Sequence, residues 1–176
     1  MRSDLDKYAS AKPACQKIAD TLLSITGASR ITYRIGTSTP GLLPVFVESL
    51  ASTPAGFLSL LVQPDIDLRQ AETFAFVVGE KKILLHNDCL DSRIASPQVL
   101  VEKYGAKSQM LLPAFVDGEV FSMVSVHEAK GVRDWEKEKA EDGRSMVQVL
   151  IQAGKDFLEA LGVKGTVPSE TDIDVA

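Results

Sequence analysis

The 176-residue chain lacks the features of several large classes of protein. It has no run of Lys or Arg that could neutralise phosphates, and its net charge is -5, so we expect no nucleic acid as a partner. Its apolar stretches are far shorter than the ~20 residues that cross a bilayer, so we expect no membrane partner. The first ten residues, MRSDLDKYAS, carry acids and no apolar core, unlike a signal peptide.

Cysteine is also scarce. Cys15 and Cys89 are the two cysteines, which are too few for a disulfide framework, so a reduced, cytoplasmic protein is expected. The length and the 45% hydrophobic content suit one domain, which we predict over residues 1–163. Residues 164–176 show no periodicity and are predicted to be a disordered tail.

Hydrophobic periodicity predicts a helix near each end of the chain. Apolar residues recur at helical spacing over 4–28, with a kink or a fresh start expected at Pro13 and a stop at Gly27. A long helix is predicted over 134–162, capped by Asp134, with acids in its first turn.

The middle of the chain alternates as strands do. Strands are predicted within 29–36, 42–50, 107–115 and 119–128, and the last two are joined by a turn at Val116–Gly118. Hairpins of this kind make an antiparallel sheet, and the terminal helices would cover one of its faces.

The remaining segments are harder to assign. Residues 67–79 are predicted to be a helix in which Asp67 and Gln70 form a capping box, although a hairpin between TFAFVV and ILLH is an alternative. Residues 96–105 predict a short helix with Ser96 as N-cap. Residues 51–66 are ambiguous between helix and strand.

The nine residues HNDCLDSRI, 86–94, follow the apolar run KKILL and concentrate reactive side chains. One interpretation is structural, with Asp88 in an Asx-turn and Asp91 paired with Arg93. In the other, the loop closes over a pocket and Arg93 binds an anionic ligand.

Two further roles involve the histidines. His86, Cys89 and His127 could begin a metal site, but zinc needs about four ligands, so we expect no metal and no cofactor. Cys89 could be a nucleophile if His86 or His127 lowered its pKa.

The strand over 119–128 has one mixed face and one valine-rich face. We predict that the valine-rich face packs against the helices and that the mixed face lines a pocket. The mixed face holds Phe121, Met123, Ser125 and His127, and the other holds Val120, Ser122, Val124 and Val126.

Three segments, in this order, resemble a GAF domain, a small-molecule-binding module related to PAS domains. NDCLDSRI resembles the family's post-strand D-x-x-x-D-x-R signature, YGAKSQMLLPAFVDGEVFSMVSVHE its central hairpin, and RDWEKEKAED the start of its last helix. The residues that carry the resemblance are Asp88, Asp91, Arg93, Gly105, Ser108, Pro113, Gly118, Glu119, Ser125, His127, Arg133 and Trp135. The match covers roughly residues 10 to 160.

The resemblance implies an α+β fold: an antiparallel sheet of five or six strands, with terminal helices on one face and a ligand pocket on the other, beneath 86–104. GAF domains bind cyclic nucleotides, bilins, haem, amino acids, 2-oxo acids and aromatics, so the fold does not name the ligand. The chain lacks the Asn-Lys-x-Asp-Glu signature of cyclic-nucleotide binders, the Cys-His pair of bilin attachment and the cysteine set of the free methionine sulfoxide reductases.

We therefore predict a sensory or regulatory protein without its own output domain that binds a polar or anionic organic ligand. The predicted ligand-binding residues are Tyr33, Asp88, Arg93, Tyr104, Gln109, Ser125 and His127. One alternative is an enzyme with His127 or Asp88 as acid or base and Cys89 as nucleophile. Another is a scaffold with a vestigial pocket. A homodimer through the terminal helices and a protein partner for output are also expected.

Overall fold

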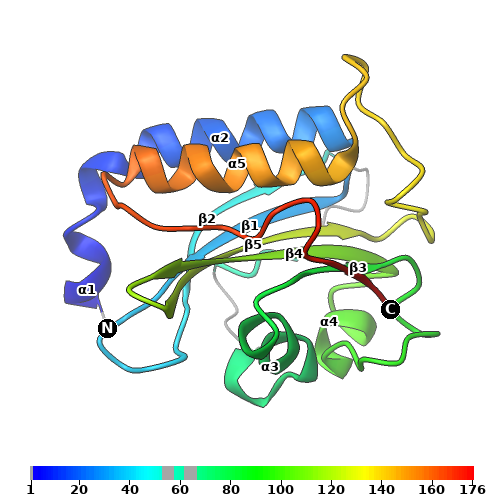
Figure 1. Ribbon diagram of the computed structural model, residues 1–176, viewed down its shortest axis with the longest axis horizontal. Coiled ribbons are helices and arrows are strands. Elements are labelled where there is room, and N and C mark those ends of the chain that lie inside the picture. The colour runs from blue at the N-terminus through cyan, green and yellow to red at the C-terminus, as the bar shows by residue number, and fades with distance from the viewer. Residues whose placement is uncertain (1, 53–57, 62–66) are drawn as a thin grey trace.

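The computed structural model describes residues 2–52, 58–61 and 67–176 and shows a six-stranded mixed sheet between two helical layers (Figure 1). The strand order is β2-β1-β5-β4-β3-β6. The strands are β1 Arg30–Ile35, β2 Val45–Leu50, β3 Ile83–His86, β4 Ser108–Val116, β5 Glu119–Glu128 and β6 Ile173–Val175. The helices are α1 Arg2–Asp6, η1 Ala9–Ala11, α2 Lys12–Thr26, η2 Leu68–Gln70, α3 Glu72–Gly79, α4 Gln98–Glu102 and α5 Met146–Ala160.

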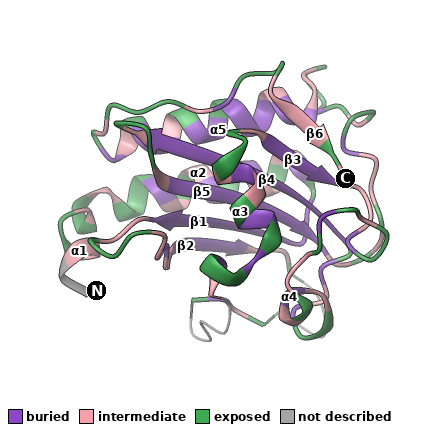
Figure 2. Cartoon of the chain, turned by 60° about the horizontal axis from the view of Figure 1, so that its bottom comes forward, coloured by how far each residue is buried: buried purple, intermediate pink, exposed green. Residues whose placement is uncertain are grey.

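The long helices α2 and α5 lie side by side on one face of the sheet, and α3 and α4 lie on the other (Figure 1). Because helices cover both faces of the sheet, its central strands are buried on both sides, and every residue of β1 is buried (Figure 2). This arrangement confirms the predicted α+β fold and the predicted position of the terminal helices.

Two apolar clusters hold these layers together. On the α2/α5 face, the ring of Tyr33 stacks on Phe157 with centroids 4.3 Å apart, beside Val124 and Val126. On the opposite face, Leu84, Leu111 and Met123 pack with residues of α3. Alternate residues of each strand therefore serve different cores.

The predicted start at Pro13 and stop at Gly27 are confirmed. Pro13 lies in the first turn of α2, where its missing N–H costs no hydrogen bond. Gly27 adopts φ 59°, the left-handed conformation that ends the helix.

The last helix begins later than predicted, because Asp134 does not cap it. Ser145 is its N-cap and forms a capping box with Gln148. Before it, the chain turns back at Gly143, which has φ 85°, and Ala140 N–H donates to the Arg144 carbonyl. The acids of 134–142 thus lie in turns rather than in a first helical turn.

Two predicted caps are also placed differently. Asp67 accepts a hydrogen bond from Arg69 N–H and caps the turn η2, while α3 begins after Ala71 without the predicted Asp67–Gln70 box. The N-cap of α4 is Pro97, not Ser96, whose hydroxyl is used elsewhere. The helical interpretation of 67–79 is otherwise confirmed, and the hairpin alternative is wrong.

The predicted disorder of 164–176 is wrong, because this segment pairs with the sheet. Thr166 and Phe115 exchange backbone hydrogen bonds of 2.8 and 2.9 Å, and β6 adds a parallel strand beside β3. The sheet is therefore mixed rather than antiparallel throughout. Most of the ambiguous segment 51–66 lies outside the described residues, and the described part, 58–61, is neither helix nor strand.

Candidate functional site

A row of buried polar side chains crosses the sheet on the face opposite α2 and α5. In the strand register, Arg30 lies opposite His127, His127 opposite Gln109, and Gln109 opposite His86. All four residues are at most 4% exposed. Because directly paired residues share one face, these side chains form a continuous polar row across four strands. Buried polar side chains are uncommon, so this row marks the candidate site.

A small cavity adjoins this row, with a volume of about 20 Å³. It is bounded by the sheet on one side and by α4, η2, α3 and Leu60 on the other. The lining residues are Arg34, Leu60, Leu68, Thr73, Pro97, Leu100, Gln109, Leu111, Met123, Ser125 and His127. In this structure the cavity has room for about one water-sized group.

His86 occupies the end of the row nearest β6 and is held by three side chains. Gln109 Nε2 lies 3.1 Å from His86 Nδ1, and Ser96 Oγ lies 3.0 Å from it. An amide nitrogen only donates, so Nδ1 must be an acceptor and the proton must reside on Nε2. Nε2–H then donates to Ser92 Oγ over 3.1 Å. Burial and the nearby Arg93 charge lower the pKa of His86 to about 4, so it is neutral near pH 7.

Arg30 and Glu48 form a buried ion pair beside the other end of the row. Arg30 Nε lies 3.2 Å from Glu48 Oε1, and both side chains are 2% exposed. Glu48 also accepts from Ser59 Oγ at 2.5 Å and Leu60 N–H at 3.0 Å. Arg30 donates to the Leu58 carbonyl at 2.7 Å. The pair therefore holds the segment 58–61 in place as a wall of the cavity.

His127 lies at the centre of the row and is incompletely bonded. Its Nδ1 is buried without a hydrogen-bond partner among the described residues, and so is Thr32 Oγ1 on the neighbouring strand. Burial, with the charges of Arg30 and Arg34, holds the pKa of His127 well below its usual range. A neutral imidazole with one nitrogen unsatisfied is thus available to a ligand.

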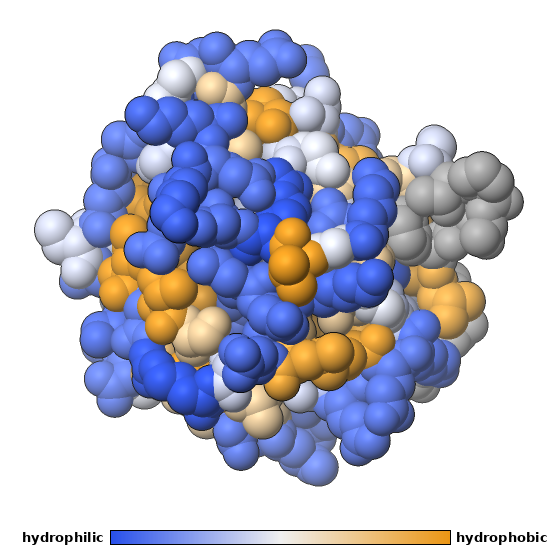
Figure 3. All heavy atoms as spheres, turned by 90° about the vertical axis from the view of Figure 1, so that its right-hand side faces the viewer, coloured by the Kyte–Doolittle hydropathy of each residue, from blue (hydrophilic) through white to orange (hydrophobic). Residues whose placement is uncertain are grey.

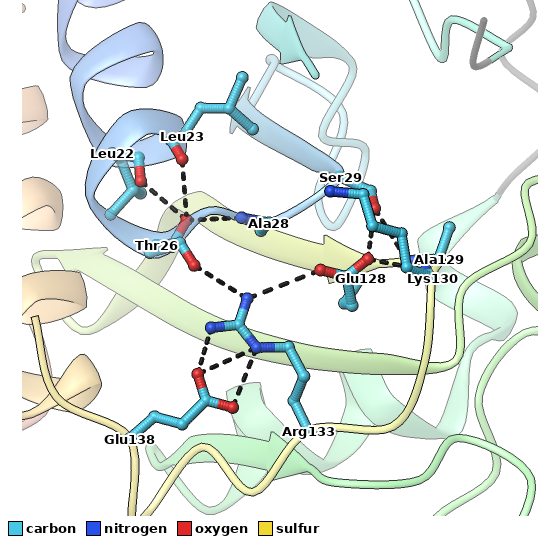
Figure 4. A network of polar contacts seen from close by, with 10 residues as sticks. All are labelled: Leu22, Leu23, Thr26, Ala28, Ser29, Glu128, Ala129, Lys130, Arg133 and Glu138. Carbon is cyan, nitrogen blue, oxygen red and sulfur yellow. Dashed lines mark hydrogen bonds and ion pairs between the residues drawn. The ribbon is translucent and has the colours of Figure 1, made fainter. Parts of the chain in front are cut away.

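A second polar network fixes the strand ends that carry Arg30 and His127 (Figure 4). Ser29 Oγ donates to Glu128 Oε1 at 2.5 Å, which ties together the residues next to Arg30 and His127 in the chain. Arg133 donates to the Thr26 carbonyl at 2.9 Å and pairs with Glu128 and Glu138. The network joins the end of α2 to β1 and β5, so it positions the row without contacting the cavity.

Three of the predicted ligand-binding residues line the cavity: Gln109, Ser125 and His127. The predicted orientation of β5 holds at Met123, Val124 and Val126.

Near its start, β5 departs from the predicted alternation. The pairing of β4 with β5 shifts register between Ala114 and Phe115. As a result Phe121 lies on the face covered by α2 and α5, where its ring contacts Tyr8. Val120 lies on the opposite face.

Tyr33 was predicted to line the pocket, and this is wrong. Its ring lies on the opposite face of β1, stacked on Phe157, and its hydroxyl is 3.5 Å from the Ala153 carbonyl. Strand alternation places Tyr33 with Ile31 and Ile35 in the core of the terminal helices.

The other predicted residues lie around the cavity rather than in its lining. Asp88 accepts from Leu90 N–H at 2.9 Å, as in the structural interpretation of an Asx-turn. Arg93 is largely exposed and pairs with Asp174 of β6, not with Asp91. Tyr104 is buried beneath the Arg30 guanidinium, 5.3 Å from its ring centre, and packs behind Leu60 and Leu100.

The residues of the enzyme alternative do not converge. Cys89 lines an outer cleft of about 260 Å³ on the surface, not the cavity that contains His127. Burial raises the pKa of the Cys89 thiol to about 11, the opposite of an activated nucleophile. Within residues 2–52, 58–61 and 67–176, no three His, Cys, Asp or Glu side chains gather as metal ligands.

The sequence-based interpretation missed three charged residues beside the cavity: Arg30, Arg34 and Glu48. The alternation of β1 could have revealed the two arginines, because Arg30, Thr32 and Arg34 share the face opposite Ile31, Tyr33 and Ile35. An alternating strand of this kind usually exposes its polar face, but every residue of β1 is buried. Arginines on a fully covered strand face indicate a site.

Comparison with known proteins gives matches in structure only. No protein-family model and no curated protein sequence matches the chain. Within the part of the chain that the structure describes, no helix is both long and apolar enough to cross a membrane.

The GAF domain of Thermosynechococcus elongatus PixJ in its blue-light absorbing form is 16% identical, with a TM-score of 0.62, over 88% of this chain and 89% of that one. The red/green cyanobacteriochrome NpR6012g4 in its green light-absorbing state is 18% identical, with a TM-score of 0.63, over 88% and 96%. The chromophore-binding domain of the bacteriophytochrome RpBphP3 from R. palustris is 16% identical, with a TM-score of 0.63, over 91% of this chain and 58% of that one.

These likenesses extend over most of the chain. At identities below 20% they establish architecture and not ligand. The chain has the fold of a GAF domain.

Proposed function

We propose that this protein is a sensory or regulatory domain that binds a small polar or anionic organic ligand in the cavity beside Gln109, Ser125 and His127. The fold supports a binding role, because the relatives in structure include GAF photoreceptor domains and one described as chromophore-binding. The polar row beneath α3 and α4 supplies the site.

The observation that carries the proposal is the unsatisfied hydrogen-bonding capacity of His127, which lines the cavity, and of Thr32, which is paired with the lining residue Ser125. His127 Nδ1 and Thr32 Oγ1 are buried without partners among the described residues. A buried polar group without a hydrogen bond costs about 1–3 kcal/mol. A ligand that bonds to them recovers that cost.

The size of the cavity favours a small ligand. Sites for larger organic molecules have volumes of roughly 300–1,000 Å³. The cavity measures about 20 Å³, although an outer cleft of about 500 Å³ lies beyond Pro97, which lines both. A compact molecule, or the small end of a longer one, fits this arrangement better than a large chromophore.

A thermal-shift screen of the purified chain against a metabolite panel tests the proposal. A ligand that binds only the folded state raises the apparent stability by RT ln(1 + [L]/Kd). The shift should disappear in His127→Leu and persist in the exposed control Lys155→Ala. A panel in which no compound stabilises the wild-type chain would favour the scaffold alternative.

We also propose that the chain forms a homodimer through α2 and α5. A groove of about 430 Å³ runs between them, with an apolar floor that includes Ile18 and Ile25. Lys17 and Asp156 both line it, so a two-fold pairing can place opposite charges together. Sedimentation equilibrium should give a dimer that Ile18→Glu, but not Ser24→Glu, converts to a monomer.

The proposal also covers the protein partner that receives the signal and the cellular location of the chain. We propose that a protein partner receives the signal, although no large apolar patch marks its position on the side seen in Figure 3, where apolar groups are small and separate. A cytoplasmic location is consistent with Cys15 and Cys89, which are both free thiols.

A further inference from the structure

Arg34 is a buried cation that has no carboxylate partner among residues 2–52, 58–61 and 67–176. It lies on β1, is 7% exposed and lines the cavity. Its guanidinium has five N–H donors, of which Nη1 donates to the Leu43 carbonyl at 2.9 Å. No carboxylate forms an ion pair with it in the described residues, whereas the neighbouring Arg30 is paired with Glu48.

The charges around the cavity sum to a positive value. Arg30 and Glu48 cancel, and burial holds His127 neutral by lowering its pKa. Burial also lowers the pKa of Arg34, to about 10, which leaves it charged near pH 7. None of the described residues that line the cavity is Asp or Glu. Among the described residues one net positive charge therefore remains beside the cavity, on a side chain that is only 7% exposed, whereas buried charges are normally paired.

The groups near Arg34 are arranged to hydrogen-bond an anion. Thr32 lies opposite Ser125 in the register, two pairs along from Arg30 and His127, and Arg34 lies opposite Met123. Thr32 Oγ1 and His127 Nδ1 have no partners among the described residues, and either can donate in a suitable rotamer or tautomer. Gln109 is different, because its amide nitrogen already contacts His86 and Ser96.

We propose that the ligand is a small organic acid whose single carboxylate pairs with Arg34 inside the cavity. This inference rests on the proposed function and narrows it to one ligand class. A carboxylate matches the planar fork of arginine and carries the one negative charge that the site lacks. A dianion such as phosphate would leave an excess negative charge, and a neutral ligand would leave Arg34 unpaired.

The test compares acids with their uncharged amides on the full chain. Isothermal titration calorimetry and thermal shift are run with propionate against propionamide, lactate against lactamide, and benzoate against benzamide, at constant ionic strength in sodium chloride. At least one acid should bind, and its amide should bind about tenfold to a hundredfold more weakly, the usual value of a hydrogen bond to a charged group.

Variants of Arg34 assign the effect to this residue. Arg34→Met should abolish acid binding while leaving the unliganded melting temperature equal or higher, because an apolar chain replaces an unpaired buried charge. Arg34→Lys keeps the charge without the fork and should weaken binding at least about tenfold, so it serves if the Met variant does not fold. The matched control Arg144→Met, an exposed arginine paired with Asp142, should bind as the wild type does.

The outcomes separate this inference from the proposed function. If amides bind as tightly as acids, or if Arg34→Met and Arg34→Lys bind acids normally, the carboxylate assignment is wrong and the ligand-binding function stands. If sodium chloride alone gives the same stabilisation as the acids, the site takes simple anions and the assignment is wrong. If neither the acids nor the wider metabolite panel binds, both proposals fail.

Discussion

The Arg30–Glu48 pair offers the sharpest test of how the site is built, through the substitution Glu48→Gln. The amide keeps the shape of the side chain and can still accept from Leu60 N–H, but it removes the charge that faces Arg30 Nε at 3.2 Å. Both side chains are 2% exposed, so Arg30 would be left as an unpaired buried cation. Breaking a buried pair in this way costs about 3–5 kcal/mol of unfolding free energy.

Urea unfolding followed by circular dichroism measures this loss, with the exposed Glu119→Gln as a matched control. The double variant Arg30→Met/Glu48→Met should be more stable than Glu48→Gln alone, because an apolar pair leaves no unpaired charge. A loss below about 1 kcal/mol in Glu48→Gln would refute the reasoning, since it is the value of an exposed ion pair. It would also mean that Glu48 does not hold the wall at Leu60.

Three further predictions concern the histidines, the thiols and the C-terminal segment. His86 has a folded pKa of about 4 against 6.5 unfolded, so its contribution to stability is present above pH 6.5 and is lost as the pH falls through 4. The pKa of His127 is also lowered by burial, so its contribution to stability changes with pH in the same direction. Urea unfolding should show a loss of about 2 kcal/mol from His86 between pH 7 and pH 5. His86→Gln should reduce the slope of stability against pH, and an unchanged slope would contradict the prediction. Cys15 and Cys89, whose pKa values burial raises to about 11, should react with a disulfide reagent only after unfolding, and rapid labelling of native Cys89 would revive the nucleophile hypothesis. In Gly165→Ala the added Cβ would lie 2.7 Å from the Phe115 carbonyl oxygen, so the free energy of unfolding should fall by about 1–3 kcal/mol. Hydrogen exchange at the Thr166 amide should become faster. The control Gly131→Ala, which has open space around the added Cβ, should change neither quantity.

Local patterns predicted the elements of the fold well where the signal lies within a few residues. Alternation located β1, β2, β4 and β5, and the turn at Asp117–Gly118 has positive φ at both residues, as a tight hairpin requires. Proline and glycine located both ends of α2. These signals depend on backbone conformation that the residues themselves dictate.

Errors arose where competing local signals or distant partners decide the structure. The acids of 134–142 imitate the first turn of a helix, but the stronger capping box of Ser145 and Gln148 sets the start of α5. The pairing of β6 with β3 joins residues about ninety positions apart, and nothing in the segment 164–176 alone encodes it.

The site was predicted in part, for a related reason. Ser125 and His127 were assigned correctly to a face because β5 alternates clearly. Tyr33 was assigned to the pocket, although its position between Ile31 and Ile35 places it on the apolar face. Arg34 was missed because the cover over its strand face comes from segments remote in the chain.

The central claim is that the ligand lies on the His127 face of the sheet, away from the terminal helices. Side-chain NMR of protein with labelled histidine and tyrosine rings tests it most directly, during titration with the strongest stabilising compound of the metabolite panel. The account predicts a shift of the His127 ring resonances and unchanged Tyr33 resonances. A ligand that shifts Tyr33 and leaves His127 unchanged would contradict it.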